Sequence, residues 1–172
     1  MNKSTFFLGI FFLTSVTFCK ADNSSINDSL FLALQNDSIA EYYKAIDQLD
    51  SAILYKNEAS IIYSHIYNES DTLYTDCLYE LACLNYDAQH FKSAITLFEK
   101  IERLQEKYKI YDVEGHSLII AHLSLSYAHM EYYPQAIKTC KMLLELKEKN
   151  ESSVDFSYEE ILGYLSNYYS AD

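Results

Sequence analysis

A pattern that repeats after 42 residues constrains the fold of this chain more than any other feature. The first copy comprises Leu81, Ala82, Phe91, Ala94, Phe98 and Ile101, and the second comprises Leu123, Ser124, Tyr133, Ala136, Cys140 and Leu143. In each copy, apolar residues recur at helical spacing in two blocks that are separated by a turn. An aromatic-x-x-Ala-Ile motif opens the second block, at residues 91–95 and again at 133–137. Such a pattern predicts tandem helical hairpins.

The composition favours long helices connected by few turns. The chain of 172 residues contains only 3 Gly and 1 Pro, and apolar residues make up 49% of it. A disordered chain would be less apolar, and an all-β chain would need more turn residues. The length suits one domain with a sizeable core.

Two hairpins follow directly from the repeat. One is expected from about residue 72 to 108, with its turn near residues 87–90. The next begins after residues 111–115, turns near residues 131–134 and ends by residue 150. Pro134 falls at the predicted start of a helix, where its missing N–H does least harm. Residues 147–153 are polar and are expected to form a linker.

An earlier hairpin is predicted between residues 25 and 67. Its first helix would end at Asn36, Asp37 and Ser38, and Asp37 or Ser38 would cap a second helix from Ile39. Residues 42–46 repeat the aromatic-x-x-Ala-Ile motif, although 49 residues rather than 42 separate them from the next copy. An alternative register pairs residues 51–53 with residues 93–95 at a spacing of 42, but it leaves no turn in the predicted helix and is ranked second.

The end of the chain resembles the first half of a further hairpin. Residues 161–169 match residues 119–127 at the same spacing of 42. The predicted organisation is therefore a signal peptide at 1–21, three hairpins at 22–150, and a half repeat or capping helix at 151–172. The half repeat leaves open whether the sequence is the front of a longer protein.

The repeated unit resembles the tetratricopeptide repeat (TPR), a helix–turn–helix unit of about 34 residues. The residues that carry the resemblance are Leu78, Leu81, Ala82, Phe91, Ala94 and Phe98 in one unit, and Ile120, Leu123, Ser124, Tyr127, Tyr133 and Ala136 in the next. Asn85 departs from the family pattern, which has an aromatic residue there, and the 42-residue unit is long. The resemblance implies an all-α, right-handed superhelix of antiparallel hairpins with about 3.5 repeats.

In the TPR family, the first helix of each hairpin lines a concave groove. The residues expected to line it here are Asp76, Tyr79, Cys83, Tyr86, Leu118, Ala121, Leu125 and Ala128. Repeats that clamp acidic peptide tails carry Lys and Arg in this groove, whereas all 11 basic residues after Ala21 lie outside the predicted first helices. We therefore expect a scaffold for protein–protein interaction whose aromatic and acidic groove binds an apolar or basic segment.

The N-terminus predicts export. Lys3 is followed by an apolar run of about 14 residues, which is shorter than the roughly 20 that a membrane span needs, and Cys19-Lys20-Ala21 provides a cleavage site. The expected location is periplasmic or secreted, with lipidation of Cys19 as the alternative that would tie the protein to a membrane. Removing residues 1–21 leaves 11 basic and 25 acidic residues, a net charge of −14. This charge disfavours nucleic acid and anionic membranes as partners.

No constellation of residues predicts catalysis, a metal or a cofactor. His122 and His129 share a helix face, with His116 nearby, but no Cys or acid stands at ligand spacing in that helix. Asp155, Glu159 and Glu160 are explained by their place at a helix start. After Ala21 three cysteines remain, Cys77, Cys83 and Cys140. They are interpreted as small buried apolar residues, and a Cys83–Cys140 bridge is left open.

Two further functions compete with a binding scaffold. One is the periplasmic sensor region of a bacterial signalling or regulatory protein, truncated here. The other is a self-assembling structural protein that stacks through its incomplete C-terminal repeat. An enzyme ranks last, and the sequence does not identify the partner.

Overall fold

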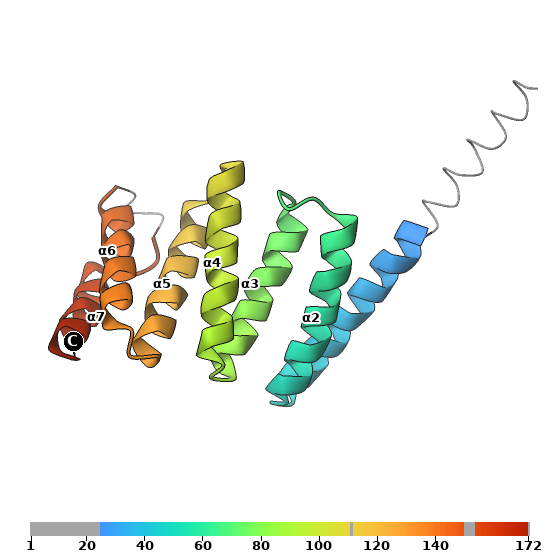
Figure 1. The fold of residues 1–172 in the computed structure, drawn as a ribbon, viewed down its shortest axis with the longest axis horizontal. Helices are drawn as coiled ribbons and strands as arrows, with labels where there is room; N and C mark the ends of the chain where they lie inside the picture. Colours follow the sequence, from blue (N-terminus) through green and yellow to red (C-terminus); the bar gives the residue numbers. More distant parts are fainter. Residues whose placement is uncertain (1–24, 111, 150–153, 172) are drawn as a thin grey trace, which may run out of the picture.

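The computed structural model of this chain describes residues 25–110, 112–149 and 154–171, and within these ranges it contains helices and no strands (Figure 1). The predicted signal peptide and most of the predicted linker lie outside the described residues. The described helices are the N-terminal helix (residues 25–45), α2 (Leu49–Ile66), α3 (Thr72–Asp87), α4 (Phe91–Tyr108), α5 (Val113–His129), α6 (Tyr133–Lys149) and α7 (Tyr158–Ala171).

The helices form a single stack in which each element packs against the one before it (Figure 1). α3 also contacts α5, so the first helices of adjacent hairpins meet directly. The predicted hairpins at 72–108 and 113–149 are present with their turns where the repeat placed them. The all-α class and the arrangement of antiparallel hairpins are confirmed.

The turn inside each hairpin has one backbone conformation that recurs every 42 residues. Asp47, Gln89 and Glu131 have positive φ angles of 58°, 61° and 60°. Behind each of them an N–H donates to the carbonyl five residues earlier: Gln48 to Tyr43 at 2.9 Å, His90 to Asn85 at 2.8 Å and Tyr132 to Tyr127 at 2.9 Å. This left-handed closure ends one helix and aims the chain back along it.

The first hairpin differs from its prediction. The N-terminal helix runs without interruption through residues 36–38, and the turn falls at residues 46–48. Asp37 does not cap a helix, because its carboxylate accepts from Lys56 at 2.9 Å and from Tyr63 at 2.6 Å. α2 begins at Leu49, which lies 42 residues before the first residue of α4. The motif at residues 42–46 is therefore the end of a first helix, and the register ranked second is the correct one.

The connections between hairpins begin the next helix with a side-chain cap. The Asp71 carboxylate accepts from the N–H of Leu73, and the Asp112 carboxylate accepts from the N–H groups of Glu114 and Gly115. At α7 the Ser157 N–H donates to Glu160 at 2.8 Å, and the Glu160 N–H donates to the Ser157 hydroxyl at 3.2 Å. Such a reciprocal pair is a capping box, and it accounts for the acid at this helix start.

Small residues stand where the helices approach most closely. Ala52, Ala94 and Ala136 are fully buried at equivalent positions of the three second helices. Facing them, Ala40, Ala82 and Ser124 are buried at equivalent positions of the first helices. The Ser124 hydroxyl donates to the backbone carbonyl of Ala136 at 3.1 Å, which leaves no room there for a longer side chain.

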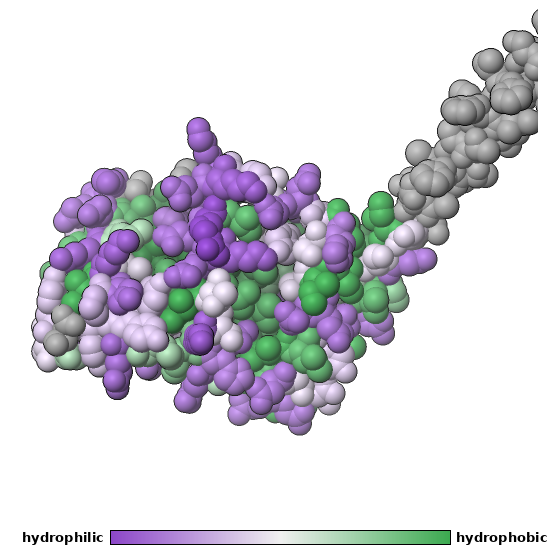
Figure 2. All heavy atoms as spheres, viewed as in Figure 1, coloured by the Kyte–Doolittle hydropathy of each residue, from purple (hydrophilic) through white to green (hydrophobic). Residues whose placement is uncertain are grey.

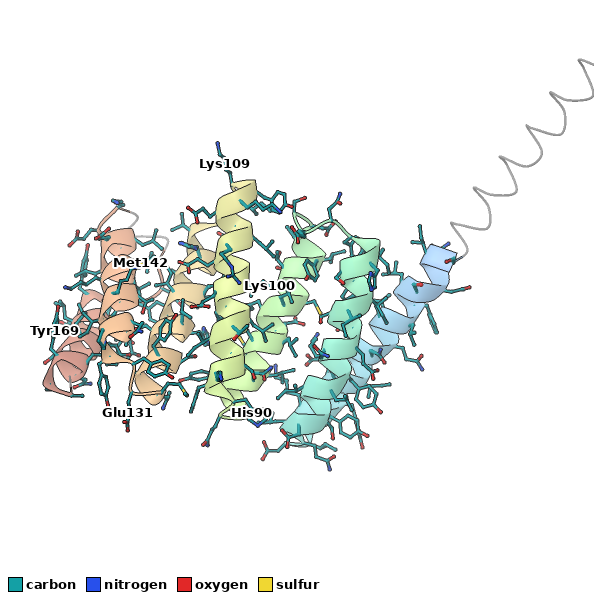
Figure 3. The ribbon with its side chains drawn as sticks, in the orientation of Figure 1. His90, Lys100, Lys109, Glu131, Met142 and Tyr169 are labelled. Carbon is teal, nitrogen blue, oxygen red and sulfur yellow. The ribbon has the colours of Figure 1, made fainter. Side chains whose placement is uncertain are left out.

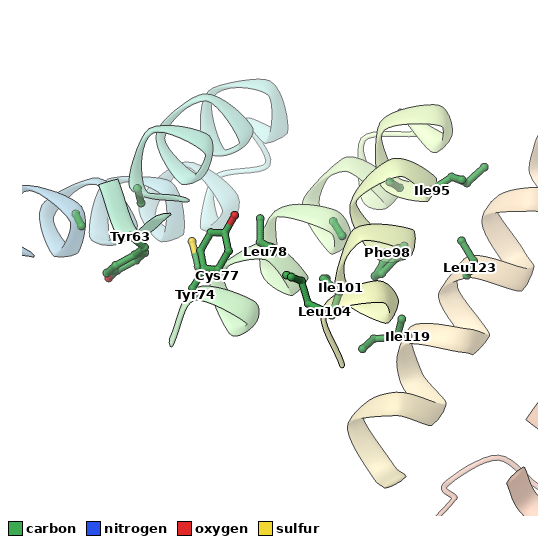
Figure 4. Packing of buried hydrophobic residues seen from close by; sticks show 14 residues of the cluster. Tyr63, Tyr74, Cys77, Leu78, Ile95, Phe98, Ile101, Leu104, Ile119 and Leu123 are labelled. Carbon is green, nitrogen blue, oxygen red and sulfur yellow. The ribbon is translucent and has the colours of Figure 1, made fainter. Parts of the chain in front are cut away.

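The core consists of two apolar clusters along the stack. The first joins the N-terminal helix and α2 to α5, and it includes Phe98, Ile101 and Leu78 (Figure 4). The second joins α5, α6 and α7 around Cys140, Leu143 and Ile161. Each hairpin thus buries its apolar face against its neighbours, as expected of a repeat protein.

Changing Ala136 to Arg should destabilise the stack by more than about 3 kcal/mol, because a charged side chain cannot enter this contact without displacing a helix. Urea unfolding followed by circular dichroism measures the loss. Gln135→Arg is the matched control, since Gln135 is the exposed neighbour on the same helix. Equal stability of the two variants would contradict the packing described here.

Candidate functional site

The predicted groove residues lie on α3 and α5, which contact each other. On α3, Asp76 is exposed, and Tyr79, Cys83 and Tyr86 are half-buried. On α5, the half-buried residues are Leu118, Leu125 and Ala128. Ala121 differs, because only 3% of its surface is exposed and it packs in the second core cluster. We call the surface formed by the other seven residues the α3–α5 groove.

A cluster of aromatic and imidazole rings occupies the junction of α3, α4 and α5. His122 stacks on Phe98 with ring centroids 5.4 Å apart, and the rings of Tyr79 and Tyr86 meet it edge-on at 6.0 and 5.6 Å. The Nδ1 of His122 donates to the Leu118 carbonyl at 2.8 Å. His122 is therefore a packed residue of the groove rather than part of a polar face.

His129 makes the same kind of contact one turn of the pattern later. Its ring stacks on Phe91 at 4.3 Å, and its Nε2 lies 3.4 Å from the Tyr86 hydroxyl. The sequence gave a signal for this pairing, because Tyr79 and His122 are 43 residues apart, as are Tyr86 and His129. In a 42-residue repeat this spacing brings residues from successive first helices together.

The groove contains a pocket at each end of the stack's cross-section. A pocket of about 380 Å³ adjoins the hairpin turn and is lined by Tyr86, Asp87, Gln89, Phe91 and His129. A pocket of about 250 Å³ adjoins the opposite loop, and its lining includes Asp76, Tyr79, Gln105, Ile110 and Leu118. Figure 3 shows these two ends: His90 and Glu131 lie at the turn end, and Lys109 lies at the other.

The acids of the groove have no basic partner in the described part of the chain. Neither Asp76 nor Asp87 makes an ion pair or a side-chain hydrogen bond there. Burial raises the pKa of the Asp76 carboxyl, and the charges of Glu80 and Asp71 raise it further. Burial and Asp87 likewise raise the pKa of Tyr86. The groove is thus a surface on which negative charge is under-compensated.

Comparisons with solved structures identify the architecture. The nearly identical TPR-like repeats attributed to a kinesin light chain of Podospora anserina match 91% of this chain and 83% of their own length, with a TM-score of 0.65 and 14% identity. The N-terminal domain of stress-induced protein-1 from C. elegans matches 82% of this chain and 97% of its own, with a TM-score of 0.60 and 9% identity. This chain has a TPR fold.

A third TPR structure extends the comparison. The TPR2AB domain of yeast Sti1, in complex with pHSP90, matches 81% of this chain and 46% of its own length, with a TM-score of 0.57 and 16% identity. No protein-family model matches the sequence, and neither does any curated protein. The likeness to TPR proteins thus lies in the fold.

The charges sort between the two kinds of TPR helix. α3, α5 and α7 contain no Lys or Arg, whereas α4 and α6 carry most of the basic residues. Hydrophilic side chains accordingly gather over α4 in Figure 2. The prediction that no basic residue lies in a first helix is wrong at Lys44, because the corrected register places it at the end of the N-terminal helix.

Lys56 is the other unusual basic residue, because it is 2% exposed. It stands where Phe98 and Cys140 stand in the next two TPR units. Its ammonium forms ion pairs with Asp37 and Glu80, and Tyr63 donates a further hydrogen bond to Asp37. Burial by itself lowers the pKa of Lys56, but the two carboxylates outweigh burial and the pKa is raised. This cluster is structural, and it joins the N-terminal helix, α2 and α3.

The structure offers no metal or disulfide chemistry in the residues it describes. No group of three or more His, Cys, Asp or Glu side chains could hold a metal ion there. Cys77, Cys83 and Cys140 are free, so the bridge left open between Cys83 and Cys140 is not formed. Burial raises the pKa of Cys83 and of Cys140 to about 11. Among the described helices, none is both long and apolar enough to cross a membrane.

Removing the buried cation should expose the dependence of the first TPR unit on this cluster. Lys56→Met leaves Asp37 without its ammonium partner, and we expect a loss of about 3 kcal/mol in the free energy of unfolding. The double variant Lys56→Met/Asp37→Asn should recover part of that loss, because no charge remains unpaired at Asp37. Urea titrations of the parent and both variants measure the three values. A double variant less stable than the single one would contradict this account.

The same cluster makes a prediction about pH. Because the pKa of Lys56 is higher in the fold than its ordinary value of 10.5, its stabilisation is complete below that value. The stabilisation is lost as the pH rises through the pKa of the folded state. The gap in stability between parent and Lys56→Met should therefore be constant near neutral pH and shrink at strongly alkaline pH.

Proposed function

We propose that this protein is an interaction scaffold that binds another polypeptide through the α3–α5 groove. The observation that carries the proposal is the separation of charge and aromatic surface on a rigid repeat. The first helices present half-buried tyrosines and unpaired acids, while the basic side chains lie on the second helices. Preformed surfaces of this kind bind partners without large rearrangement.

Related folds support binding as the general role. The yeast Sti1 TPR domain was solved as a complex with pHSP90. In the present chain the first helices carry a single basic residue, Lys44, which disfavours an acidic peptide tail as the ligand. An apolar or basic segment matches this groove better.

The proposed place of action is outside the cytoplasm. The apolar run before Ala21, the cleavage-site pattern and the acidic mature chain support export to the periplasm or the medium, with a Cys19 lipid anchor as the alternative. Binding would then take place between exported proteins.

Capture from the native periplasm or medium tests the proposal. Immobilised protein carrying Asp76→Arg and Leu118→Glu should lose at least ten-fold of the partner that the parent enriches, since these changes reverse one charge and add another in the groove. Glu106→Arg is the matched control, because it reverses an exposed charge on α4. The proposal fails if parent, groove variant and control enrich the same proteins equally.

Self-assembly is a second candidate, favoured by an observation at α7. Leu162 and Tyr169 are 52% and 56% exposed, whereas the equivalent Leu78 and Ile120 of earlier repeats are buried. Phe31 is 70% exposed at the other end of the stack, where apolar side chains also gather in Figure 2. These end surfaces have the character of open contacts between copies.

If copies associate through α7, light scattering of the mature chain should show a molar mass that rises with concentration. Leu162→Glu should return the protein to a monomer, because a charge on this surface opposes apolar association. Leu73→Glu is the control, since Leu73 is equally exposed on α3. A parent that stays monomeric over a wide concentration range rules this candidate out.

A further inference from the structure

The two pockets of the groove have the same composition at opposite ends of α3. Each combines an unpaired aspartate with a tyrosine: Asp76 with Tyr79 in one pocket and Asp87 with Tyr86 in the other. Eleven residues separate the two aspartates, which is close to three helical turns. Both carboxylates therefore lie on the same face of α3, about 16 Å apart along the helix.

The chemistry of each pocket matches a guanidinium group. An aspartate supplies two acceptor oxygens for its planar donors, and an aromatic ring offers a face or edge on which it stacks. The phenyl ring of Phe91 adds a second ring in the pocket at the turn end. A lysine ammonium would meet the same charge with less of the stacking.

The surface between the pockets is of a different kind. It is formed by Cys83 on α3 and by Leu125 on α5, with the rings of Tyr79, His122 and Tyr86 beside them. Lys44 acts on the Cys83 thiol and lowers its pKa, while burial, Asp87 and Glu80 raise it. A positive charge already lies near the centre, so a ligand is best apolar there and basic at its two ends.

We propose that the α3–α5 groove binds an extended peptide segment with two arginines about five residues apart and apolar residues between them. The spacing follows from the geometry, since an extended chain advances about 3.3 Å per residue and must cover about 16 Å. This inference rests on the proposed binding function and adds the chemistry and spacing of the ligand. The occupant is thus a partner polypeptide, bound alongside α3 and α5.

Fluorescence anisotropy with synthetic peptides tests the spacing. A labelled seven-residue peptide with arginines at positions 1 and 6 and apolar residues between them should bind the mature protein. A peptide of the same composition with adjacent arginines should bind at least five-fold more weakly, because it fills one pocket only. Equal binding of the two peptides would overturn the proposed spacing.

Neutral substitutions test the pockets. Asp76→Asn/Asp87→Asn should weaken the spaced peptide at least ten-fold and reduce the salt dependence of binding. Glu106→Gln on α4 is the control and should leave binding unchanged. Undiminished binding by the double variant would overturn the inference.

Capture of a native partner separates this inference from the function on which it rests. A partner that is lost with Asp76→Arg/Leu118→Glu but does not compete with the spaced peptide would overturn the arginine inference and leave the scaffold function standing. A parent protein that captures no partner through the groove would overturn both. Competition by the spaced peptide, and not by the peptide with adjacent arginines, is the expected result.

Discussion

The close contact between helices at small residues is the constraint on which the rest of the structure depends. Ala52, Ala94 and Ala136 allow the backbone of one helix to lie against the next, and Ser124 reaches the carbonyl of Ala136 across that contact. Because the contact recurs every 42 residues, the turns and the caps must recur with it. The superhelix therefore follows from one distance between helices, repeated along the chain.

The sequence predicted two hairpins correctly and misplaced the turn of the first, for an identifiable reason. Residues 42–46 imitate the motif that opens a second helix, although they end a first one. The true motif at residues 51–53 was obscured because Lys56 occupies the core position held by Phe98 and Cys140. Its burial depends on Asp37 and Glu80, which come from two other helices. A local pattern does not reveal a lysine that partners far away in sequence make compatible with a core.

The groove was predictable as a list of positions, but its chemistry depended on contacts between repeats. Tyr79 and Tyr86 were assigned to it from helical spacing alone. The two histidines were interpreted as a polar face, whereas His122 and His129 pack among the aromatic rings of α3 and α4. Ala121 was assigned to the surface, yet α5 turns it into the core beside α6 and α7. Such differences arise because helix phase is fixed by packing to a precision that periodicity does not provide.

Negative charge in the groove works against the free protein and in favour of a bound one. Asp76 is partly desolvated and faces Glu80 and Asp71, so its ionised form is disfavoured until a cation arrives. Elsewhere the chain compensates buried charge fully, as the ion pairs of Lys56 demonstrate. Both treatments of charge occur within one helix, because Glu80 of α3 pairs with Lys56 while Asp76 of α3 has no partner in the described part of the chain. A fold selected for stability alone would have paired or removed that aspartate, so its unpaired state points to a ligand that supplies the missing charge.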